Sequence, residues 1–164
     1  MQVLHKKTRR QTGAAFALAA VVLLSSSGAL AAVCIRPSEA PALETRMIQT
    51  ELMVAALTCD QRTGYNNFIT KFKGDLIARG KSLRSLFQRL YGNVAESKLN
   101  TFVTRIANET SLRSIQTDGY CQSTAELFAD LRAVSPGGLA AFAAAQPSSD
   151  KHGLPVCTEL SENP

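Results

Sequence analysis

Four cysteines, Cys34, Cys59, Cys121 and Cys157, are the residues of this chain best suited to covalent chemistry. An even number of cysteines is typical of disulfides in an exported protein, whereas a zinc site usually shows C-x-x-C pairs. The chain has no such pair, and His152 is its only histidine after position 31. The pattern favours two disulfides over free thiols or a metal site, and it predicts no metal and no cofactor.

Groups that could catalyse a reaction are few. A Ser-His-Asp arrangement is not expected, because His152 lies in the C-terminal tail, where we expect a solvated loop residue. The sequence contains no H-E-x-x-H, P-loop or G-x-G-x-x-G motif. Paired carboxylates would suffice for glycoside cleavage, with Glu51 and Glu109 as candidates. However, we expect Glu51 to be partly exposed and Glu109 to pair with Arg113, so no catalytic residue is assigned.

Basic residues gather in the middle of the chain. Positions 71–113 hold nine Lys and Arg against three Asp and Glu, a net charge of about +6. Such a concentration can form a positive patch for an anionic partner. The alternative is that these are ordinary solvated helix faces, partly neutralised by acids elsewhere in the fold. The candidate basic face comprises Lys71, Lys73, Arg79, Lys81, Arg84, Arg89 and Arg105.

The N-terminal segment has the order of features of a secretory signal peptide. Four basic residues between positions 6 and 10 precede an apolar run over 12–24, and Ala29-Leu30-Ala31 matches an A-x-A cleavage site. The run is shorter than the roughly 20 residues that span a bilayer. We therefore expect Sec-type export to the periplasm or the exterior, with cleavage after Ala31. A lipid on Cys34 is less favoured, because Val33 does not suit a lipobox.

Cleavage would change the charge balance of the protein. The whole chain carries 18 Lys and Arg against 13 Asp and Glu, and four of the basic residues lie before position 32. The remaining 133 residues hold 14 basic against 13 acidic residues, so their composition predicts no nucleic-acid partner. We expect a cleaved signal at 1–31, one helical domain at 32–145, and a loose tail at 146–164 tied near Cys157.

Apolar residues recur at helical spacing over most of 41–145, and no stretch alternates as a strand would. Helices are predicted over about 41–58, 65–79, 82–91, 93–115, 123–134 and 136–145. The fold class is therefore all-α, a compact bundle of five to six helices. The clearest apolar stripe consists of Tyr65, Phe68, Ile69, Phe72 and Leu76.

Several residues are expected to mark helix ends. A glycine commonly follows the last residue of a helix, so Gly80 should end the second helix. Two capping boxes are expected, one from Asn93 with Glu96 and one from Ser123 with Glu126.

The helix lengths restrict the disulfide pairing. A helix of about 18 residues between Cys34 and Cys59 would hold them about 27 Å apart, whereas a disulfide needs Cα atoms within about 7 Å. If Cys59 at the end of the first helix meets Cys121 at the start of the fifth, those helices run antiparallel. The chain then returns toward Cys34. We therefore predict the pairs Cys59–Cys121 and Cys34–Cys157.

These observations favour an exported, non-enzymatic helical module. It would bind an envelope protein or an anionic envelope component through the basic face. Two alternatives are a carboxylate-dependent cell-wall enzyme and a small periplasmic chaperone. No transmembrane span is expected after cleavage, and the sequence leaves the ligand, the process and the oligomeric state open.

Overall fold

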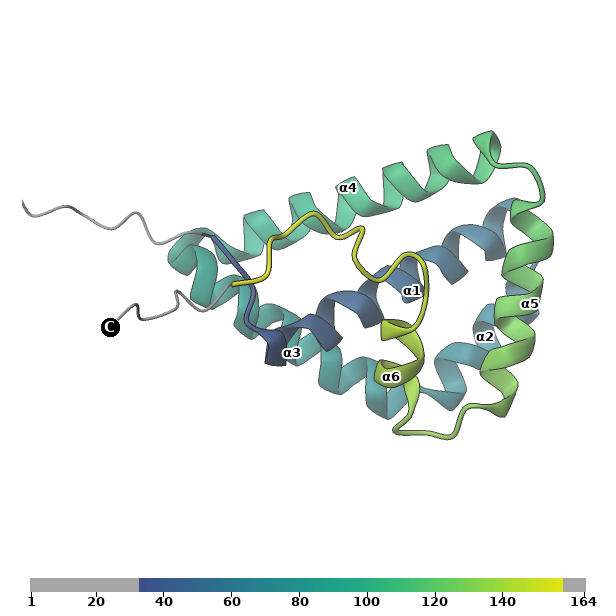
Figure 1. Ribbon diagram of the computed structural model, residues 1–164, viewed down its shortest axis with the longest axis horizontal. Coiled ribbons are helices and arrows are strands. Elements are labelled where there is room, and N and C mark those ends of the chain that lie inside the picture. The colour runs from purple at the N-terminus through teal and green to yellow at the C-terminus, as the bar shows by residue number, and fades with distance from the viewer. Residues whose placement is uncertain (1–32, 158–164) are drawn as a thin grey trace, which may run out of the picture. The chain divides into compact units, whose positions relative to one another are not determined.

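The computed structural model describes residues 33–157, and within this range it is helical without a regular strand (Figure 1). The predicted all-α fold is therefore confirmed. The expected signal peptide, its cleavage site after Ala31, and positions 158–164 of the expected tail lie outside the described residues. In chain order the elements are the 3-10 helix η1 (Pro37–Glu39), α1 (Ala40–Thr58), α2 (Arg62–Lys71), α3 (Lys73–Tyr91), the 3-10 helix η2 (Gly92–Val94), α4 (Ala95–Gln116), α5 (Tyr120–Ala133) and α6 (Leu139–Ala144).

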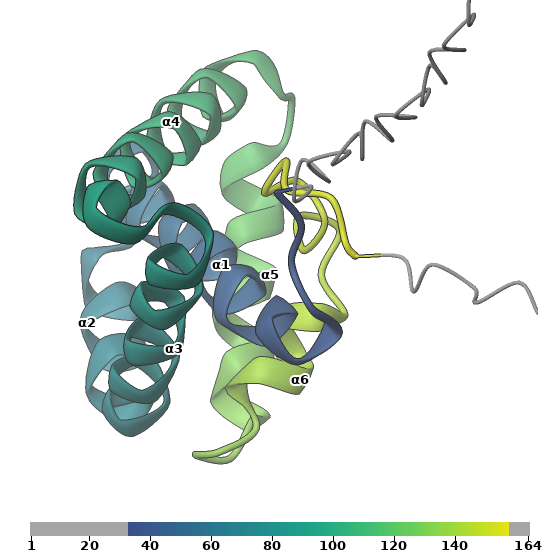
Figure 2. The ribbon, with the colours of Figure 1, turned by 90° about the vertical axis from the view of Figure 1, so that its left-hand side faces the viewer.

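α1 is the central helix, and each of the other five α-helices packs against it (Figures 1 and 2). Its buried side chains, which include Leu43, Ile48 and Leu52, face in several directions around the helix. A helix that is apolar on most sides is stable only when other elements surround it. The surrounding helices supply this cover, so α1 is buried along most of its length.

The core consists of two apolar clusters that both use α1. The first joins α1 to α2, α5 and α6 through residues such as Phe68, Phe72 and Phe128. The second joins the start of α1 to α3 and α4, where the Phe87 and Phe102 ring centroids are 5.3 Å apart. Burying a side chain of this kind contributes about 1.5–3 kcal/mol. The second cluster fixes α3 and α4 relative to α1.

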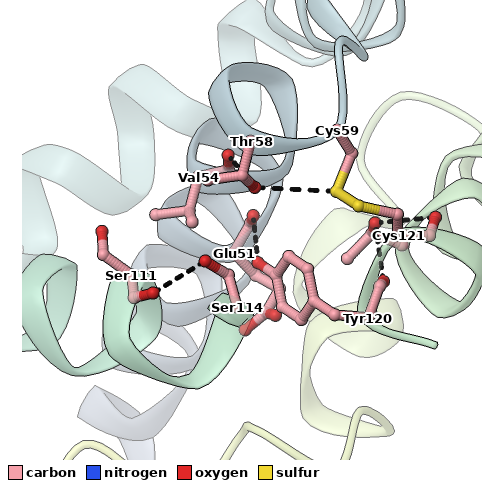
Figure 3. Close-up of a disulfide and its surroundings, with 9 residues drawn as sticks. Glu51, Val54, Thr58, Cys59, Ser111, Ser114, Tyr120 and Cys121 are labelled. Atoms are coloured by element: carbon pink, nitrogen blue, oxygen red, sulfur yellow. Dashed lines mark hydrogen bonds between the residues drawn. A yellow bond between two sulfur atoms is a disulfide. The ribbon is translucent and has the colours of Figure 1, made fainter. Parts of the chain in front are cut away.

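Both predicted disulfides are present. Cys59–Cys121 joins the end of α1 to the first turn of α5 with 5.4 Å between Cα atoms (Figure 3). Cys34–Cys157 joins the two ends of the described chain with 4.9 Å between Cα atoms. Beside it the Ile35 N–H donates to the Pro155 oxygen and the Cys157 N–H donates to the Ile35 oxygen, both at 2.8 Å. Residues 155–157 are thereby held against the start of the chain.

The predicted break at Gly80 is wrong. α3 runs from Lys73 through Gly80 to Tyr91, and the actual break is the single residue Phe72. A glycine inside a helix costs about 1 kcal/mol relative to alanine. That cost is smaller than the stabilisation from Leu83 and Leu86, which are buried on the same helix beyond the glycine.

The two predicted capping boxes are also not formed. Asn93 lies inside η2, and α4 begins after Val94, which makes no side-chain capping hydrogen bond. α5 begins at Tyr120, directly after Gly119 in the left-handed conformation (φ 73°), so Ser123 lies inside the helix. Gly92 and Gly119, both with positive φ, turn the chain before α4 and α5. Each helix therefore begins at a different residue from the one predicted.

Candidate functional site

Three residues of the candidate basic face are engaged within the fold. Arg89 Nε donates to Glu39 Oε1 at 2.7 Å, and its Nη2 donates to the Cys34 carbonyl oxygen at 3.0 Å. Lys71 Nζ donates to the Leu131 and Arg132 carbonyl oxygens at the end of α5, at 3.1 and 2.7 Å. A lysine at a helix C-terminus satisfies carbonyl groups that have no partner within the helix.

Arg105 is the third of these residues. Its Nη1 lies 3.0 Å from both carboxylate oxygens of Glu109, one turn along α4. Its Nη2 donates to the His152 carbonyl oxygen at 2.6 Å. Arg105 therefore connects α4 to the C-terminal segment of the described chain.

The other four candidates, all on α3, form no ion pair and no side-chain hydrogen bond within residues 33–157. Lys73, Lys81 and Arg84 are exposed, and Arg79 is half-buried. Arg79 and Arg84 line a hollow between α1, α3 and α4, whereas the two lysines lie outside its lining.

This hollow has a volume of about 210 Å³. Its walls combine arginines and amide side chains with an apolar floor. α1 contributes Ala42, Thr45, Arg46 and Gln49; α3 contributes Leu76, Arg79, Gly80, Leu83 and Arg84; and α4 contributes Glu96, Leu99, Asn100 and Val103. We call this site the arginine groove.

Arg46 distinguishes the arginine groove from an ordinary basic surface. Its Nη1 hydrogen-bonds to Gln49 Oε1 at 3.3 Å. Its Nε is buried without a partner, the one buried side-chain nitrogen or oxygen in this condition among the described residues. Burial lowers the pKa of the Arg46 guanidinium from its ordinary value. A guanidinium stays protonated in proteins, so α1 carries a partly buried charge with no carboxylate partner in the described chain.

Other partly buried arginines in this fold do have carboxylate partners. Arg89 pairs with Glu39, and Arg113 pairs with Glu51. Burying a charge is costly unless it is paired and hydrogen-bonded. The arginine groove instead holds three guanidiniums and a single acid, Glu96. A concave site lined by one sign of charge concentrates the field and attracts an ion of opposite sign.

The predicted pair of Glu109 and Arg113 is wrong, since Arg113 reaches across to Glu51 on α1. The Glu51 side chain is only 12% exposed and requires a counter-charge, whereas that of Glu109 is 51% exposed and pairs with Arg105. Burial first, and the neighbouring Glu51 carboxylate second, raise the pKa of Tyr120, whose hydroxyl donates to the Glu51 backbone oxygen at 3.4 Å (Figure 3). The two acids therefore belong to separate ion pairs.

His152 is buried, with 6% of its surface exposed, so its expected place in a solvated loop is wrong. Its Nδ1 accepts a hydrogen bond from the Leu154 N–H at 3.1 Å. Leu154 packs against the second core cluster, and the Cys34–Cys157 disulfide holds the chain there. These tertiary contacts, which local composition does not indicate, exclude water from the imidazole.

Comparisons with family models, curated proteins and solved structures found no match to the chain. Among the described residues, no three His, Cys, Asp or Glu side chains are grouped so as to hold a metal ion. No helix in that part of the chain is long and apolar enough to cross a membrane.

Sequence reasoning found Arg79 and Arg84 but missed Arg46, Gln49 and Asn100. The available signal was a single arginine within a helix that is otherwise apolar on several sides. Such a residue pairs with an acid, extends to solvent or lines a hollow, and Arg46 lines the arginine groove.

Proposed function

We propose that this chain is an exported, non-enzymatic binding protein of the periplasm or cell exterior. It holds an anionic group of an envelope protein or envelope component in the arginine groove. The observation that carries this proposal is the convergence of Arg46, Arg79 and Arg84 on one groove, without a carboxylate partner in the described chain.

Guanidinium chemistry supports an oxyanion ligand. Arginine presents a planar set of N–H donors that matches carboxylate and phosphate oxygens. A hydrogen bond to a charged group contributes about 1.5–3 kcal/mol. Two or three such bonds would give an affinity in the micromolar to millimolar range. An anion would also provide the counter-charge that Arg46 lacks.

Two further observations support export. Residues 1–31 have the order of features of a signal peptide. All four cysteines form disulfides, which persist mainly in oxidising compartments.

The test is recovery of cross-linked partners from native cells that produce charge-reversed variants. Arg79→Glu with Arg84→Glu should abolish recovery of the partner found with the wild-type chain. Lys73→Glu with Lys81→Glu reverses two charges on the same helix outside the groove and is the matched control. Equal recovery from both variants, or equal loss, would contradict the assignment. Arg89 is unsuitable for this test because it binds Glu39.

A further inference from the structure

We infer that the ligand of the arginine groove is an extended acidic peptide segment of a partner protein. The segment would lie between α3 and α4 with its carboxylates at Arg46, Arg79 and Arg84. This inference rests on the proposed function and specifies the chemical class of its ligand.

The depression is long enough to hold an extended peptide. A second hollow of about 340 Å³ adjoins the arginine groove and shares Arg84, Glu96 and Leu99 with it. Together they follow α3 from Leu76 to Gly92, the residue directly after the end of the helix. This distance is about 24 Å at 1.5 Å per residue. An extended peptide of about seven residues covers the same length at roughly 3.3 Å per residue.

The chemical character of the lining changes along the depression. Arg46 and Arg79 line only the first hollow, and Arg84 lines both. The far end presents Ser85, Gln88 and Asn93. Hydroxyl and amide groups both donate and accept, so they can pair with the N–H and C=O groups of a peptide backbone. The lining therefore suits a chain that is anionic at one end and neutral at the other.

Glu96 and Arg84 both line the two hollows, so their charges offset each other where the hollows meet. The net positive charge therefore lies at the end with Arg46 and Arg79, and a uniformly anionic polymer would find no counter-charge beyond the junction. Aromatic stacking for a sugar ring is also lacking, because Phe87, the one aromatic residue lining the second hollow, is 2% exposed.

The concave shape of the arginine groove favours a peptide over a membrane surface. A membrane surface is broad, so anionic lipids would meet the exposed Lys73, Lys81 and Arg84 more readily than Arg46, whose Nε is buried. A peptide side chain can enter the concave site between the helices and reach Arg46. The unpaired charge of Arg46 thus favours a peptide carboxylate over a lipid surface.

Gly80 keeps the arginine groove open and provides a steric test. It lines the groove, and an added Cβ there would have no heavy atom within 4 Å. Gly80→Leu would therefore fill the groove and leave every charge in place. Gly74 on the same helix also faces open space but lies outside the lining, so Gly74→Leu is the matched control.

The experiment is an NMR titration of the oxidised, isotope-labelled protein. The probe is a blocked peptide of about seven residues with two glutamates at one end and serine and glycine elsewhere. We expect shifts of backbone amides along positions 76–91 of α3, at Gly92, and along positions 96–103 of α4. Gly80→Leu should weaken binding at least about tenfold and Gly74→Leu should not, while replacing the peptide glutamates by glutamines should also cost at least about tenfold.

Other probes separate failure of the inference from failure of the proposed function. Inorganic phosphate binding at the arginines without peptide binding would overturn the peptide assignment and leave an anion site. Binding to phosphatidylglycerol vesicles that survives Gly80→Leu would overturn the groove and identify a surface electrostatic contact. If peptide, phosphate and vesicles all fail to bind, both the inference and the anion-binding function are contradicted.

Discussion

Arg105 on α4 donates a hydrogen bond to the backbone oxygen of His152, 47 residues further along the chain. The His152 imidazole in turn accepts a hydrogen bond from the Leu154 N–H through Nδ1. The first contact holds the C-terminal segment against α4, and the second fixes the conformation of residues 152–154 within that segment. The second requires a neutral imidazole, because a protonated ring has no acceptor nitrogen.

The stability of the protein should therefore fall in mild acid. Burial chiefly lowers the pKa of His152 below its ordinary value of 6.5, with Arg105 acting in the same direction and Asp150 opposing. As pH falls below 6.5 the unfolded state binds a proton that the folded state does not. The stability that the neutral His152 imidazole contributes is fully present above pH 6.5. It is lost as the pH falls through the pKa of His152 in the folded protein. Urea unfolding at about pH 7.5 and about pH 5.5 measures the loss.

His152→Gln is the control for this pH dependence. Glu44, whose pKa is raised by burial, is present in both proteins and cancels in the comparison. We expect a smaller decrease in unfolding free energy between the two pH values in the variant. An equal decrease in both proteins would mean that other groups cause the acid sensitivity.

Arg89→Ala should destabilise the fold, because Arg89 bonds both Glu39 and the Cys34 carbonyl oxygen. The pair is partly exposed, so the expected loss is about 1 kcal/mol. The hydrogen bond from Arg89 is the main cause that lowers the pKa of Glu39 below 4.5. The stability that the ionised Glu39 contributes is present above pH 4.5. It is lost as the pH falls through the pKa of Glu39 in the folded protein.

NMR titration of the Glu39 carboxyl group measures this contact directly. The pKa of Glu39 should rise toward 4.5 in Arg89→Ala. An unchanged pKa would show that the ion pair is absent in solution. Peptide binding at the arginine groove should not change in this variant.

Phe72 and Gly80 show what helical spacing in the sequence can predict and what it cannot. The stripe from Tyr65 to Leu76 correctly predicts which side chains meet the core, because helical spacing determines a face. The same stripe continues across the break at Phe72, so spacing gives no sign of it. Gly80 looks like a helix end, but only packing of residues beyond it decides whether the helix continues.

The candidate site was only partly predictable for a related reason. Arg79 and Arg84 belong to the basic region of the sequence. Arg46 stands alone on α1, and its lack of a partner depends on where α3 and α4 place their side chains. Charge counts along a chain contain no information about such tertiary pairing.

Gly80→Ala should raise the unfolding free energy by about 0.5–1 kcal/mol. The residue lies within α3, and the added methyl group would meet no heavy atom within 4 Å. Gly74→Ala should give a similar gain for the same reason. Denaturant unfolding of both variants tests this expectation. A loss of stability at Gly80 alone would indicate that the groove is narrower than the structure shows.

Export with removal of the signal peptide determines the mass of the mature protein. Protein from the envelope fraction should have the mass of residues 32–164, and its cysteines should react with an alkylating agent only after reduction. A chain that retains residues 1–31, or that carries a lipid, would contradict cleavage after Ala31. Thiols that react without reduction would contradict the two disulfides.

The most direct test of the arginine groove is Arg46→Met. Methionine keeps much of the side-chain volume and removes a partly buried charge that has no counter-ion in the described chain. We predict that unfolding free energy without ligand stays equal or rises by roughly 1 kcal/mol, while binding of the acidic peptide is lost. If instead the variant loses stability and still binds the peptide, Arg46 serves the fold and the groove is not the binding site.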